Sequence, residues 1–468
     1  MTAKALILAA GAGTRMKSDK PKVVHEVLGK PLVRWVVDAA HDAGIEDVVT
    51  VLGHMSEKVA PLVDGDTKIA IQTQQLGTGD AVNAGREAFT QADGSIAEGS
   101  LVVLSGDCPL ITPETIQALI AKREETGAAV VVLTMHMDDP FGYGRIVREG
   151  EAVVRIVEQK DANEQEAAIT ECNSGFYCFD AQALFDALSR VSNDNAQGEY
   201  YLTDVLEICR NDGREVLALQ TADAEEAMGV NSRVQLAQAT RAMQHRINNR
   251  HMMAGVTMWD PESTFIGPDV EIAQDVELWP QTYLLGATKV GSRSVIGPNT
   301  RLTDTQVGSG ARVDETVAIE ACIDDAAECG PRAYLRPGTH LCEGAKAGTH
   351  VEIKKSTIGK GSKVPHLSYI GDTTMGENVN IGAGSITCNY DGVNKNHTEI
   401  GDNVFVGSDT MMVAPVNIGA GAIIGASSCI TRDVAPDALA LERADQREIE
   451  GWAAKHMAKL KAKKEAAK

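Results

Sequence analysis

Short apolar runs alternate with longer amphipathic stretches over the first half of the chain. The run at residues 4–10 leads into glycines, and similar runs follow at 46–53, 68–74, 100–107 and 127–135. Helical patterns separate them at 31–44, 56–63, 79–90 and 113–126. This alternation predicts an α/β domain with a Rossmann-like, mostly parallel sheet. Ligands of such sheets bind at the carboxyl ends of the strands, here at residues 11–15, 72–78 and 107.

From residue 260 the pattern changes to a period of six. Aliphatic side chains occupy every sixth position from Ile266 to Leu302, and again from Ile400 to Ile430. A period of six is typical of a parallel β-helix built from hexapeptide repeats. At about 18 residues per coil, the repeats predict about nine coils stacked over roughly 45 Å. The period fails at 388–399, which predicts a loop with a turn at Asp391-Gly392.

A polar stretch joins the two patterns and predicts a helix that Ser232 caps and that ends near Gly255. We therefore divide the chain into an N-terminal α/β domain at 1–231, a linker helix at 232–255, a β-helix domain at 256–451 and a tail at 452–468. The tail holds six lysines and one glutamate. It predicts a helical or frayed terminus, and its charge leaves open a role toward a membrane surface or anionic ligand phosphates.

Composition narrows the class of protein. The 468-residue chain has a formal net charge of −21, which argues against a general nucleic-acid binder. No apolar run reaches the ~18 residues of a membrane helix, and no secretory signal is evident. The nine cysteines include no CxxC pair, and no histidine pair has zinc-site spacing, so we expect a cytoplasmic protein with reduced structural thiols. The aromatic fraction of 4% suits a narrow β-helix core of Ile, Val and Leu.

The glycine-rich loop after the first strand carries the clearest chemical signal. Residues 8–16 read LAAGAGTRM, which matches neither the GxGxxG pattern nor a Walker A loop. Glycines let backbone N–H groups approach a phosphate closely. Arg15, Lys17, Lys20 and Lys22 concentrate positive charge, although residues 1–230 hold 19 basic and 37 acidic side chains. The loop is therefore suited to bind phosphates.

Together with Lys20-Pro21-Lys22, this loop resembles the signature of sugar-1-phosphate nucleotidylyltransferases. The resemblance implies in-line attack of a sugar phosphate on the α-phosphorus of a nucleoside triphosphate, which depends on charge neutralisation and alignment. It implies Arg15 and Lys22 as catalytic cations and Mg²⁺, one or two ions, held by Asp107 and Asn231. Substrate contacts are implied for Leu8, Ala9, Ala10, Gly11, Lys22, Gln72, Gly77, Thr78, Ser105, Gly106, Asp107, Gly144, Glu158, Asn173 and Asn231.

The segment KVPHLSYIGD, which contains His366, resembles the KxxHLxYxGD motif of glucosamine-1-phosphate acetyltransferases. The resemblance implies His366 as the general base that deprotonates the attacking amine. Proteins with this repeat form left-handed β-helices that assemble as homotrimers and bind acyl-CoA between subunits. Thr349-His350 and residues 441–446 depart from the usual residues of these proteins. Implied sugar-phosphate contacts are Arg336, Lys354, Tyr369 and Asn380, and implied acetyl-CoA contacts are Ala383, Asn389, Tyr390, Ser408, Ala426 and Arg443.

Both halves, in this order, resemble the bacterial family of bifunctional N-acetylglucosamine-1-phosphate uridylyltransferases and glucosamine-1-phosphate N-acetyltransferases. The resemblance covers nearly all of residues 1–452 and implies the small-molecule substrates UTP, glucosamine-1-phosphate, N-acetylglucosamine-1-phosphate and acetyl-CoA. One alternative is a single-activity nucleotidylyltransferase whose β-helix only assembles or regulates, and the pairing of His366 with Tyr390 argues against it. A second is a scaffold with a decayed nucleotide domain, against which the intact loop and Asp107 argue.

Overall fold

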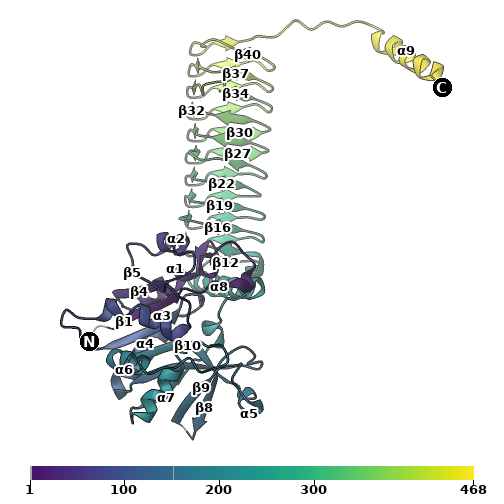
Figure 1. The fold of residues 1–468 in the computed structure, drawn as a ribbon. Helices are drawn as coiled ribbons and strands as arrows, with labels where there is room; N and C mark the ends of the chain where they lie inside the picture. The colour runs from purple at the N-terminus through teal and green to yellow at the C-terminus, as the bar shows by residue number, and fades with distance from the viewer. Residues whose placement is uncertain (1–2, 151, 468) are drawn as a thin grey trace. The chain divides into compact units, whose positions relative to one another are not determined.

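The structure is a computed structural model that describes residues 3–150 and 152–467. It divides into two compact units, an α/β unit and a β-helix unit (Figure 1). The α/β unit comprises Met1–Arg250 with Phe265–Pro268, and the β-helix unit comprises His251–Thr264 with Asp269–Lys468. The two predicted architectures are therefore both present in the chain.

The α/β unit is built on a nine-stranded sheet. Its main path runs β11-β7-β10-β6-β1-β4-β5, and the strand β1 at its centre pairs in parallel with both β4 and β6. The five predicted apolar runs form the strands β1 (Lys4–Ala9), β4 (Asp47–Leu52), β5 (Lys68–Ile71), β6 (Ser100–Ser105) and β7 (Val130–His136). Four of them are mostly buried, as expected of strands covered on both faces, whereas β5 at the end of the sheet is mostly exposed. The strand β11 (Val216–Gln220) was not predicted and pairs in parallel with β7.

Two antiparallel features extend the predicted alternation. The strand β10 (Glu171–Asp180) runs antiparallel between β6 and β7. A hairpin of β8 (Arg145–Glu149) and β9 (Ala152–Val157) pairs with β10. These elements bring the predicted sugar-binding residues to the same edge as the glycine-rich loop. A short ribbon of β2 (Glu26–Val27) and β3 (Lys30–Pro31) also belongs to this unit.

The predicted helices form with two interruptions. The segment 56–63 breaks into α2 (Ser56–Val59) and a 3₁₀ turn that contains Pro61, and the segment 79–90 breaks at Gly85. Ser232 Oγ accepts a hydrogen bond from the N–H of Gln235 at 3.2 Å, as the prediction of a helix cap requires. The remaining helices are α1 (Leu32–Asp42), α3 (Thr78–Ala84), α4 (Pro113–Thr126), α5 (Glu164–Ala167), α6 (Ala181–Leu188), α7 (Asp204–Asn211) and α8 (Arg233–Met253).

The β-helix unit consists of three parallel sheets of 11, 10 and 9 strands, which we name after one member of each. The β30 sheet contains β12 (Thr257–Met258), β15 (Glu277–Leu278), β18 (Val295–Ile296), β21 (Arg312–Val313), β24 (Glu328–Cys329), β27 (Lys346–Thr349), β30 (Lys363–His366), β33 (Asn380–Ile381), β36 (Phe405–Val406), β39 (Ile423–Ile424) and β41 (Leu439–Ala440).

The other two sheets complete each coil. The β28 sheet contains β13 (Phe265–Ile266), β16 (Tyr283–Leu285), β19 (Arg301–Thr303), β22 (Val317–Ile319), β25 (Tyr334–Leu335), β28 (Glu352–Lys354), β31 (Tyr369–Gly371), β34 (Ile386–Cys388), β37 (Met411–Val413) and β40 (Cys429–Ile430). The β26 sheet contains β14 (Glu271–Ile272), β17 (Lys289–Val290), β20 (Gln306–Val307), β23 (Cys322–Ile323), β26 (His340–Leu341), β29 (Thr357–Ile358), β32 (Thr373–Met375), β35 (Thr398–Ile400) and β38 (Val416–Ile418).

This hexapeptide-repeat unit is the left-handed parallel β-helix that the sequence predicts, with more coils than expected. The sheets of 11 and 10 strands exceed the expected nine coils, and the third sheet, with 9 strands, equals that number. The coil shortens between Leu302 and Ala318, which are direct neighbours only sixteen residues apart. The six-residue period is therefore lost there while the stacking of buried aliphatic side chains continues.

Two further segments follow the predictions. Residues 389–397 leave the regular coil between β34 and β35, and Asp391 accepts N–H bonds from Val393 at 2.8 Å and Asn394 at 2.6 Å. The basic tail forms the helix α9 (Trp452–Ala466), whose side chains are all exposed. Among the described residues, no helix combines the length and apolar character that crossing a bilayer requires.

Candidate functional sites

A cavity of about 370 Å³ opens at the carboxyl ends of β1 and β6. The structure brings together at its wall most of the substrate contacts implied for the α/β unit. Val23, Gln75, Ala81 and Glu199 also line it, although sequence reasoning missed them. Gln75 lies within the predicted QTQQLGTG stretch, and its Nε2 donates to the Ala10 carbonyl at 2.7 Å. The predicted residues at the wall are Leu8, Ala9, Ala10, Gly11, Lys22, Gln72, Gly77, Thr78, Ser105 and Asp107.

Lys22 joins the two residues that the sequence predicts as metal ligands. Its Nζ donates to Oδ2 of Asp107 in a short ion pair and to Oδ1 of Asn231 at 2.8 Å. Val230 N–H donates to the Asp107 carbonyl at 2.9 Å and fixes the Asn231 segment beside the end of β6. Two side-chain oxygens from distant segments therefore converge on one cation.

Gly13 makes the position of Lys22 possible. Its backbone has φ +63°, and an added Cβ would lie 2.5 Å from Cβ of Lys22. L-residues rarely adopt this left-handed conformation, and no side chain fits in that space. The glycine-rich loop thus leaves room for Lys22, the predicted catalytic cation, beside Asp107 and Asn231.

Gln72 is buried at the end of β5, where its side chain is held in one orientation. Its Nε2 donates to Oδ2 of Asp80 at 2.8 Å and to the carbonyl of Gly77 at 3.2 Å. Within the described residues no donor binds its Oε1. An amide oxygen held in this way is suited to accept a hydrogen bond from the edge of a base.

The three predicted sugar contacts Gly144, Glu158 and Asn173 lie together beside this cavity. An added Cβ on Gly144 would lie 3.5 Å from Cβ of Asn173 and 3.6 Å from Oε1 of Glu158. Burial raises the pKa of the Glu158 carboxyl, and the nearby acidic groups raise it further. The Thr203 hydroxyl, which donates a hydrogen bond to this carboxyl at 3.3 Å, offsets only part of the increase. A polar, partly desolvated pocket of this kind suits sugar hydroxyl groups.

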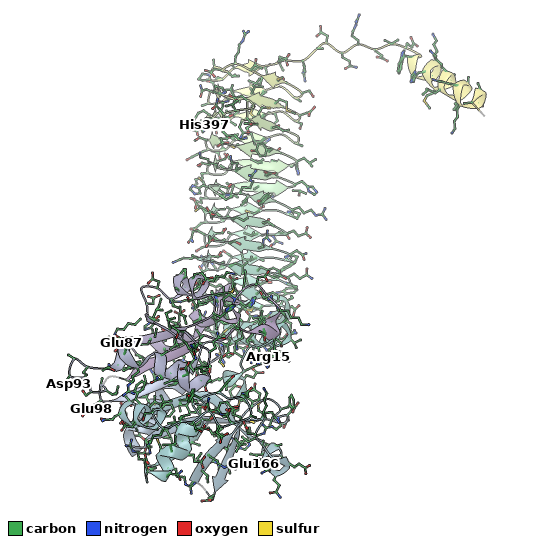
Figure 2. The ribbon with its side chains drawn as sticks, in the orientation of Figure 1. Arg15, Glu87, Asp93, Glu98, Glu166 and His397 are labelled. Carbon is green, nitrogen blue, oxygen red and sulfur yellow. The ribbon has the colours of Figure 1, made fainter. Side chains whose placement is uncertain are left out.

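Two other predicted residues, Gly106 after β6 and Arg15 in the glycine-rich loop, do not line this cavity. Gly106 N–H donates to the Leu8 carbonyl at 2.9 Å, so its contribution is to the backbone beneath the cavity. Arg15 is exposed on the 3₁₀ turn Thr14–Met16 and does not line the cavity (Figure 2). The structure therefore does not join Arg15 to Lys22, and its catalytic role stays a prediction.

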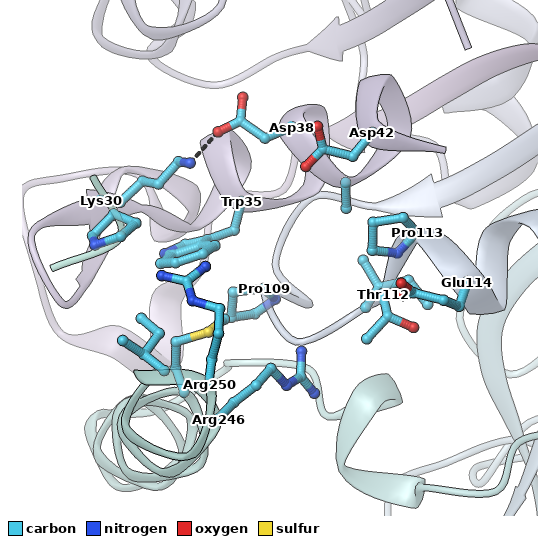
Figure 3. Close-up of a pocket in the computed structure, with 15 residues that line it drawn as sticks. Lys30, Trp35, Asp38, Asp42, Pro109, Thr112, Pro113, Glu114, Arg246 and Arg250 are labelled. Atoms are coloured by element: carbon cyan, nitrogen blue, oxygen red, sulfur yellow. Dashed lines mark ion pairs between the residues drawn. The ribbon is translucent and has the colours of Figure 1, made fainter. Parts of the chain in front are cut away.

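A second cavity of the α/β unit, about 260 Å³, lies between α1, the start of α4 and α8 (Figure 3). Its lining includes Trp35, Glu114, Arg246 and Arg250. Lys30 forms an ion pair with Asp38 at its edge. The residues that the sequence predicts for chemistry do not line it, and ten of them line the cavity of about 370 Å³ instead.

In the β-helix unit, the predicted phosphate contacts Arg336 and Lys354 are neighbours on adjacent coils. Register places them side by side, and Arg336 N–H donates to the Ile353 carbonyl at 2.8 Å. Nη1 of Arg336 also donates to Glu352 at 2.9 Å, an interaction that raises the pKa of the arginine. Two cations one coil apart suit a phosphate monoester.

Tyr369, Asp372 and Asn389 extend this cluster. Asn389 Nδ2 donates to Oδ2 of Asp372 at 2.6 Å and to Oη of Tyr369 at 3.4 Å, and Lys354 Nζ lies 3.6 Å from Asp372. A Cβ on Gly371 would lie 2.5 Å from the Tyr369 hydroxyl oxygen and 2.6 Å from Asn389 Nδ2. Sequence reasoning missed Asp372 and Glu352, although Asp372 ends the quoted YIGD motif.

His366 stands at the exposed end of β30. Register along the β30 sheet places it one coil from Ala383, then Ser408 and Ala426. The Asp409 N–H donates to the Ala383 carbonyl at 2.7 Å, and the Ser427 N–H donates to the Ser408 carbonyl at 2.8 Å. One predicted acetyl-transfer base and three predicted acetyl-CoA contacts therefore form a single column, the His366 column.

The remaining predicted contacts lie on different elements of the β-helix unit. Arg443 Nη1 donates to the Ala426 carbonyl at 3.0 Å. Asn380 pairs with Lys363 in the strand beside His366. Tyr390 begins the protruding loop, is 56% exposed, and lies under the Nζ of Lys395 at 3.9 Å from the ring centre. Within the described residues the imidazole of His366 makes no hydrogen bond.

Comparison with known proteins gives matches across both units. Residues 5–212 match the family described as MobA-like NTP transferase domain, and residues 397–432 match Bacterial transferase hexapeptide (six repeats). Curated relatives named Bifunctional protein GlmU match nearly end to end. The Streptomyces avermitilis protein is 49% identical and covers 97% of this chain and 94% of its own length. The Syntrophomonas wolfei protein is 49% identical, and the match covers 96% of this chain and 99% of the relative. The Streptomyces coelicolor protein is 51% identical, and the match covers 97% of this chain and 94% of the relative.

Proposed function

The chain belongs to the family of bifunctional GlmU proteins, and we propose that its two units carry out two consecutive transfers. The β-helix unit acetylates glucosamine-1-phosphate with acetyl-CoA. The α/β unit then transfers a uridylyl group from UTP to N-acetylglucosamine-1-phosphate and releases pyrophosphate. The product is UDP-N-acetylglucosamine, a precursor of bacterial cell-wall polymers.

The observation that carries this proposal is the presence of two separate sets of phosphate-binding and reactive groups. Lys22, Asp107 and Asn231 converge in the α/β unit. Arg336 and Lys354 lie beside the Tyr369 cluster in the β-helix unit. A nucleotidylyltransferase with a purely structural β-helix has no need of the second set.

The uridylyl site favours Mg²⁺ as its metal. Asp107 and Asn231 present a carboxylate and an amide oxygen to one cation, and oxygen ligands are those that Mg²⁺ prefers. When bound, one or two Mg²⁺ ions would neutralise the phosphates and orient them. Lys22 holds a positive charge at the same place, and the Gln72 amide and the Thr78 segment orient the base. Catalysis by alignment and charge neutralisation is what phosphoryl-type transfer requires.

For the acetyl transfer, the His366 imidazole takes a proton from the glucosamine amine as the nitrogen attacks the thioester carbon. The nitrogen–carbon bond forms, the carbon–sulfur bond breaks, and CoA leaves as its thiol after protonation. Arg336 and Lys354 hold the sugar phosphate, and Tyr369 and Asn380 orient the sugar. The His366 column runs parallel to the coil stack, which lets an extended acetyl-CoA lie along Ala383, Ser408 and Ala426.

We also propose a homotrimer assembled through the β-helix. Phe405, Ile423 and Leu439 are direct neighbours on three successive strands of the β30 sheet and are 50%, 48% and 64% exposed. This apolar stripe borders the His366 column, and contiguous exposed apolar surface is typical of protein interfaces. A second copy placed on the stripe would enclose the acetyl-CoA column between subunits.

The cytoplasm is the compartment that fits these proposals. All nine cysteines are free thiols in the structure, as expected where thiols are kept reduced. UTP and acetyl-CoA are metabolites of that compartment.

Reciprocal variants test the proposed function. With glucosamine-1-phosphate, acetyl-CoA, UTP and Mg²⁺, the parent should form UDP-N-acetylglucosamine, pyrophosphate and free CoA thiol. His366→Ala should lose acetyl transfer and retain uridylyl transfer from N-acetylglucosamine-1-phosphate, while Asp107→Ala should do the reverse. Absence of CoA release by the parent would instead support the single-activity alternative.

A further inference from the structure

Cys322, Asp324 and His340 form a compact cluster on the β26 sheet, away from the residues assigned to acetyl transfer. One ligand atom from each lies within 4.8 Å of the other two. His340 Nε2 lies 2.8 Å from Oδ2 of Asp324, and Cys322 Sγ lies 3.4 Å from Oδ1 of the same carboxylate. The three side chains are partly exposed, so solutes reach them.

Strand register adds a fourth group. Cys322 is the direct neighbour of His340, and Ile323 is the direct neighbour of Leu341. Asp324 and Cys342 therefore follow in the same register, and Cys342 stands on the same outward side as His340. Two coils thus present Cys-x-Asp and His-x-Cys to the same face. The sequence did not indicate this set because its two halves are 16 residues apart and share no local zinc-site spacing, and the expectation of reduced structural thiols stays a prediction.

We propose that Cys322, Asp324, His340 and Cys342 bind a divalent zinc ion that cross-links two adjacent coils of the β-helix. Thiolate, imidazole and carboxylate are the ligands of protein zinc sites, which are four-coordinate and tetrahedral when structural. The cluster offers one of each and a second sulfur. Binding would displace the thiol protons to solvent and replace the hydrogen bond from Cys322 to Asp324 with metal coordination.

The separation of Cys322 and Cys342 argues against a disulfide between them. Cys322 and Cys342 are diagonal neighbours, one coil and two residues apart, which corresponds to roughly 8 Å between Cα atoms. Disulfides require Cα atoms closer than about 7 Å. A metal ion spans that separation because each sulfur stays about 2.3 Å from a shared centre.

The proposed site connects to the acetyl-transfer unit through the coil itself. His340 follows Arg336 by four residues, and Thr339 Oγ1 donates to the Arg336 carbonyl at 2.7 Å. Fixing His340 to the preceding coil would therefore hold the corner that carries Arg336. The role is structural, and the readouts that test it are metal content and stability as well as activity.

Metal binding by the purified full-length chain tests the proposal. After chelation and buffer exchange, the chain should take up one Zn²⁺ per polypeptide. Co²⁺ in place of Zn²⁺ should give the visible bands of a tetrahedral site and a sulfur-to-cobalt charge-transfer band. Zn²⁺ should raise the melting temperature of the parent, as expected of a ligand that binds only the folded state.

Substitution of the proposed ligands tests whether Zn²⁺ binds at this cluster. Cys322→Ser, His340→Ala and Cys342→Ser should each weaken Zn²⁺ binding by at least about tenfold and lose the thermal shift. Two matched controls should bind as the parent does: Cys429→Ser removes another partly exposed thiol, and His397→Ala removes another histidine that pairs with a carboxylate, Glu399.

Other results would overturn the proposal. A parent chain that binds less than a tenth of an equivalent of Zn²⁺, or whose Co²⁺ form lacks the sulfur charge-transfer band, has no such site. The Co²⁺ spectrum needs no variant, so the proposal stays testable even where a substitution prevents folding. Zinc binding that survives Cys322→Ser and His340→Ala, or that Cys429→Ser abolishes, places the metal elsewhere.

Discussion

Nζ of Lys22 lies 2.8 Å from Oδ1 of Asn231, a residue 209 positions later in the chain. The same ammonium pairs with Asp107, so it occupies the space between the two oxygens proposed to bind Mg²⁺. A lysine that fills a metal position competes with the metal until a substrate phosphate draws it away. We therefore expect Lys22 to act both as a phosphate-binding cation and as the group that holds Asp107 and Asn231 together.

Lys22→Met tests this double role. Removing the competing ammonium should strengthen Mn²⁺ binding to the nucleotide-free chain, measured by paramagnetic resonance. The same change should lower uridylyl transfer by about 10²–10³-fold, because a preorganised cation at the phosphates is lost. Lys17→Met, an exposed lysine of the same loop, is the control. Weaker Mn²⁺ binding in Lys22→Met would contradict the competition.

Comparison of Gly13→Ala with Gly94→Ala separates the effect of the close contact with Lys22 from the effect of backbone strain at a positive φ. The added Cβ would meet Lys22 at 2.5 Å, so we expect uridylyl transfer to fall by about 100-fold through misplacement of the cation. Gly94 has a similar positive φ of +84° but open space around its missing Cβ, so Gly94→Ala reports strain alone. Both should lose about 1 kcal/mol of unfolding free energy in urea melts. Equal activity of the two variants would exclude the proposed contact.

The sequence predicts the parallel strands β1, β4, β6 and β7 because each is a continuous, mostly buried apolar run. The same pattern does not predict the strand β10. In its first half, buried Cys172 and Ser174 alternate with half-buried Asn173 and Gly175, and this pattern lacks an apolar run. The pattern does not predict the hairpin β8–β9 for a related reason, because exposed and buried residues are mixed within both strands. Gly144 and Glu158 were placed at the site only through family resemblance.

Contacts between distant segments depend on strand register, which local periodicity cannot supply. Leu302 to Val307 is a step of five, and so is Val313 to Ala318. Each short step shifts all later residues by one position relative to a strict count of six. The neighbours of Cys322 and of His366 therefore follow from the stacked coils. The residue types at the sites were predictable from motifs, but not the pairings.

Gly371→Ala should disable acetyl transfer without affecting the uridylyl site. The new Cβ would lie 2.5 Å from the Tyr369 hydroxyl and 2.6 Å from Asn389, and Gly371 lies within a strand, so no strain from a positive φ is involved. We expect CoA release to fall at least about tenfold, since small misplacements of binding groups slow reactions strongly. Gly310→Ala is the comparison away from the proposed site: its surroundings are open and its φ is +67°, so it reports backbone strain in the β-helix without a steric contact. Full acetyl transfer by Gly371→Ala would remove Tyr369 and Asn389 from the site.

Asp204 gives a prediction about pH. Burial raises the pKa of its carboxyl to about 6, with Glu207 and Asp161 adding to the effect. A carboxyl whose pKa rises on folding lowers the free energy of unfolding once it ionises. This destabilisation is absent below about pH 4, grows between about pH 4 and about pH 6, and stays constant at higher pH. Asp204→Asn should therefore melt higher than the parent near pH 8 and at the same temperature near pH 4. Since Asp204 is only half buried, we expect a gain of about 1 kcal/mol or less.

The matched control for Asp204 is Asp138→Asn, which changes an exposed carboxyl. Its melting temperature should follow that of the parent across the same pH range. A difference between Asp204→Asn and the parent that stays constant with pH would show that the change acts through packing rather than ionisation.

Ile423→Lys tests whether the apolar stripe joins copies of the chain. Ile423 is the central member, with Phe405 and Leu439 as its direct neighbours. A buried, unpaired ammonium would destabilise an interface there, so light scattering should report a monomer in place of a trimer. Acetyl transfer should then fall by at least about tenfold, because the acetyl-CoA column borders the stripe. Uridylyl transfer should persist, since its cavity lies wholly within the α/β unit. Ile449→Lys, an exposed aliphatic residue outside the β-helix strands, should leave both assembly and acetyl transfer unchanged. A trimeric Ile423→Lys chain with full acetyl transfer would place the interface on another sheet.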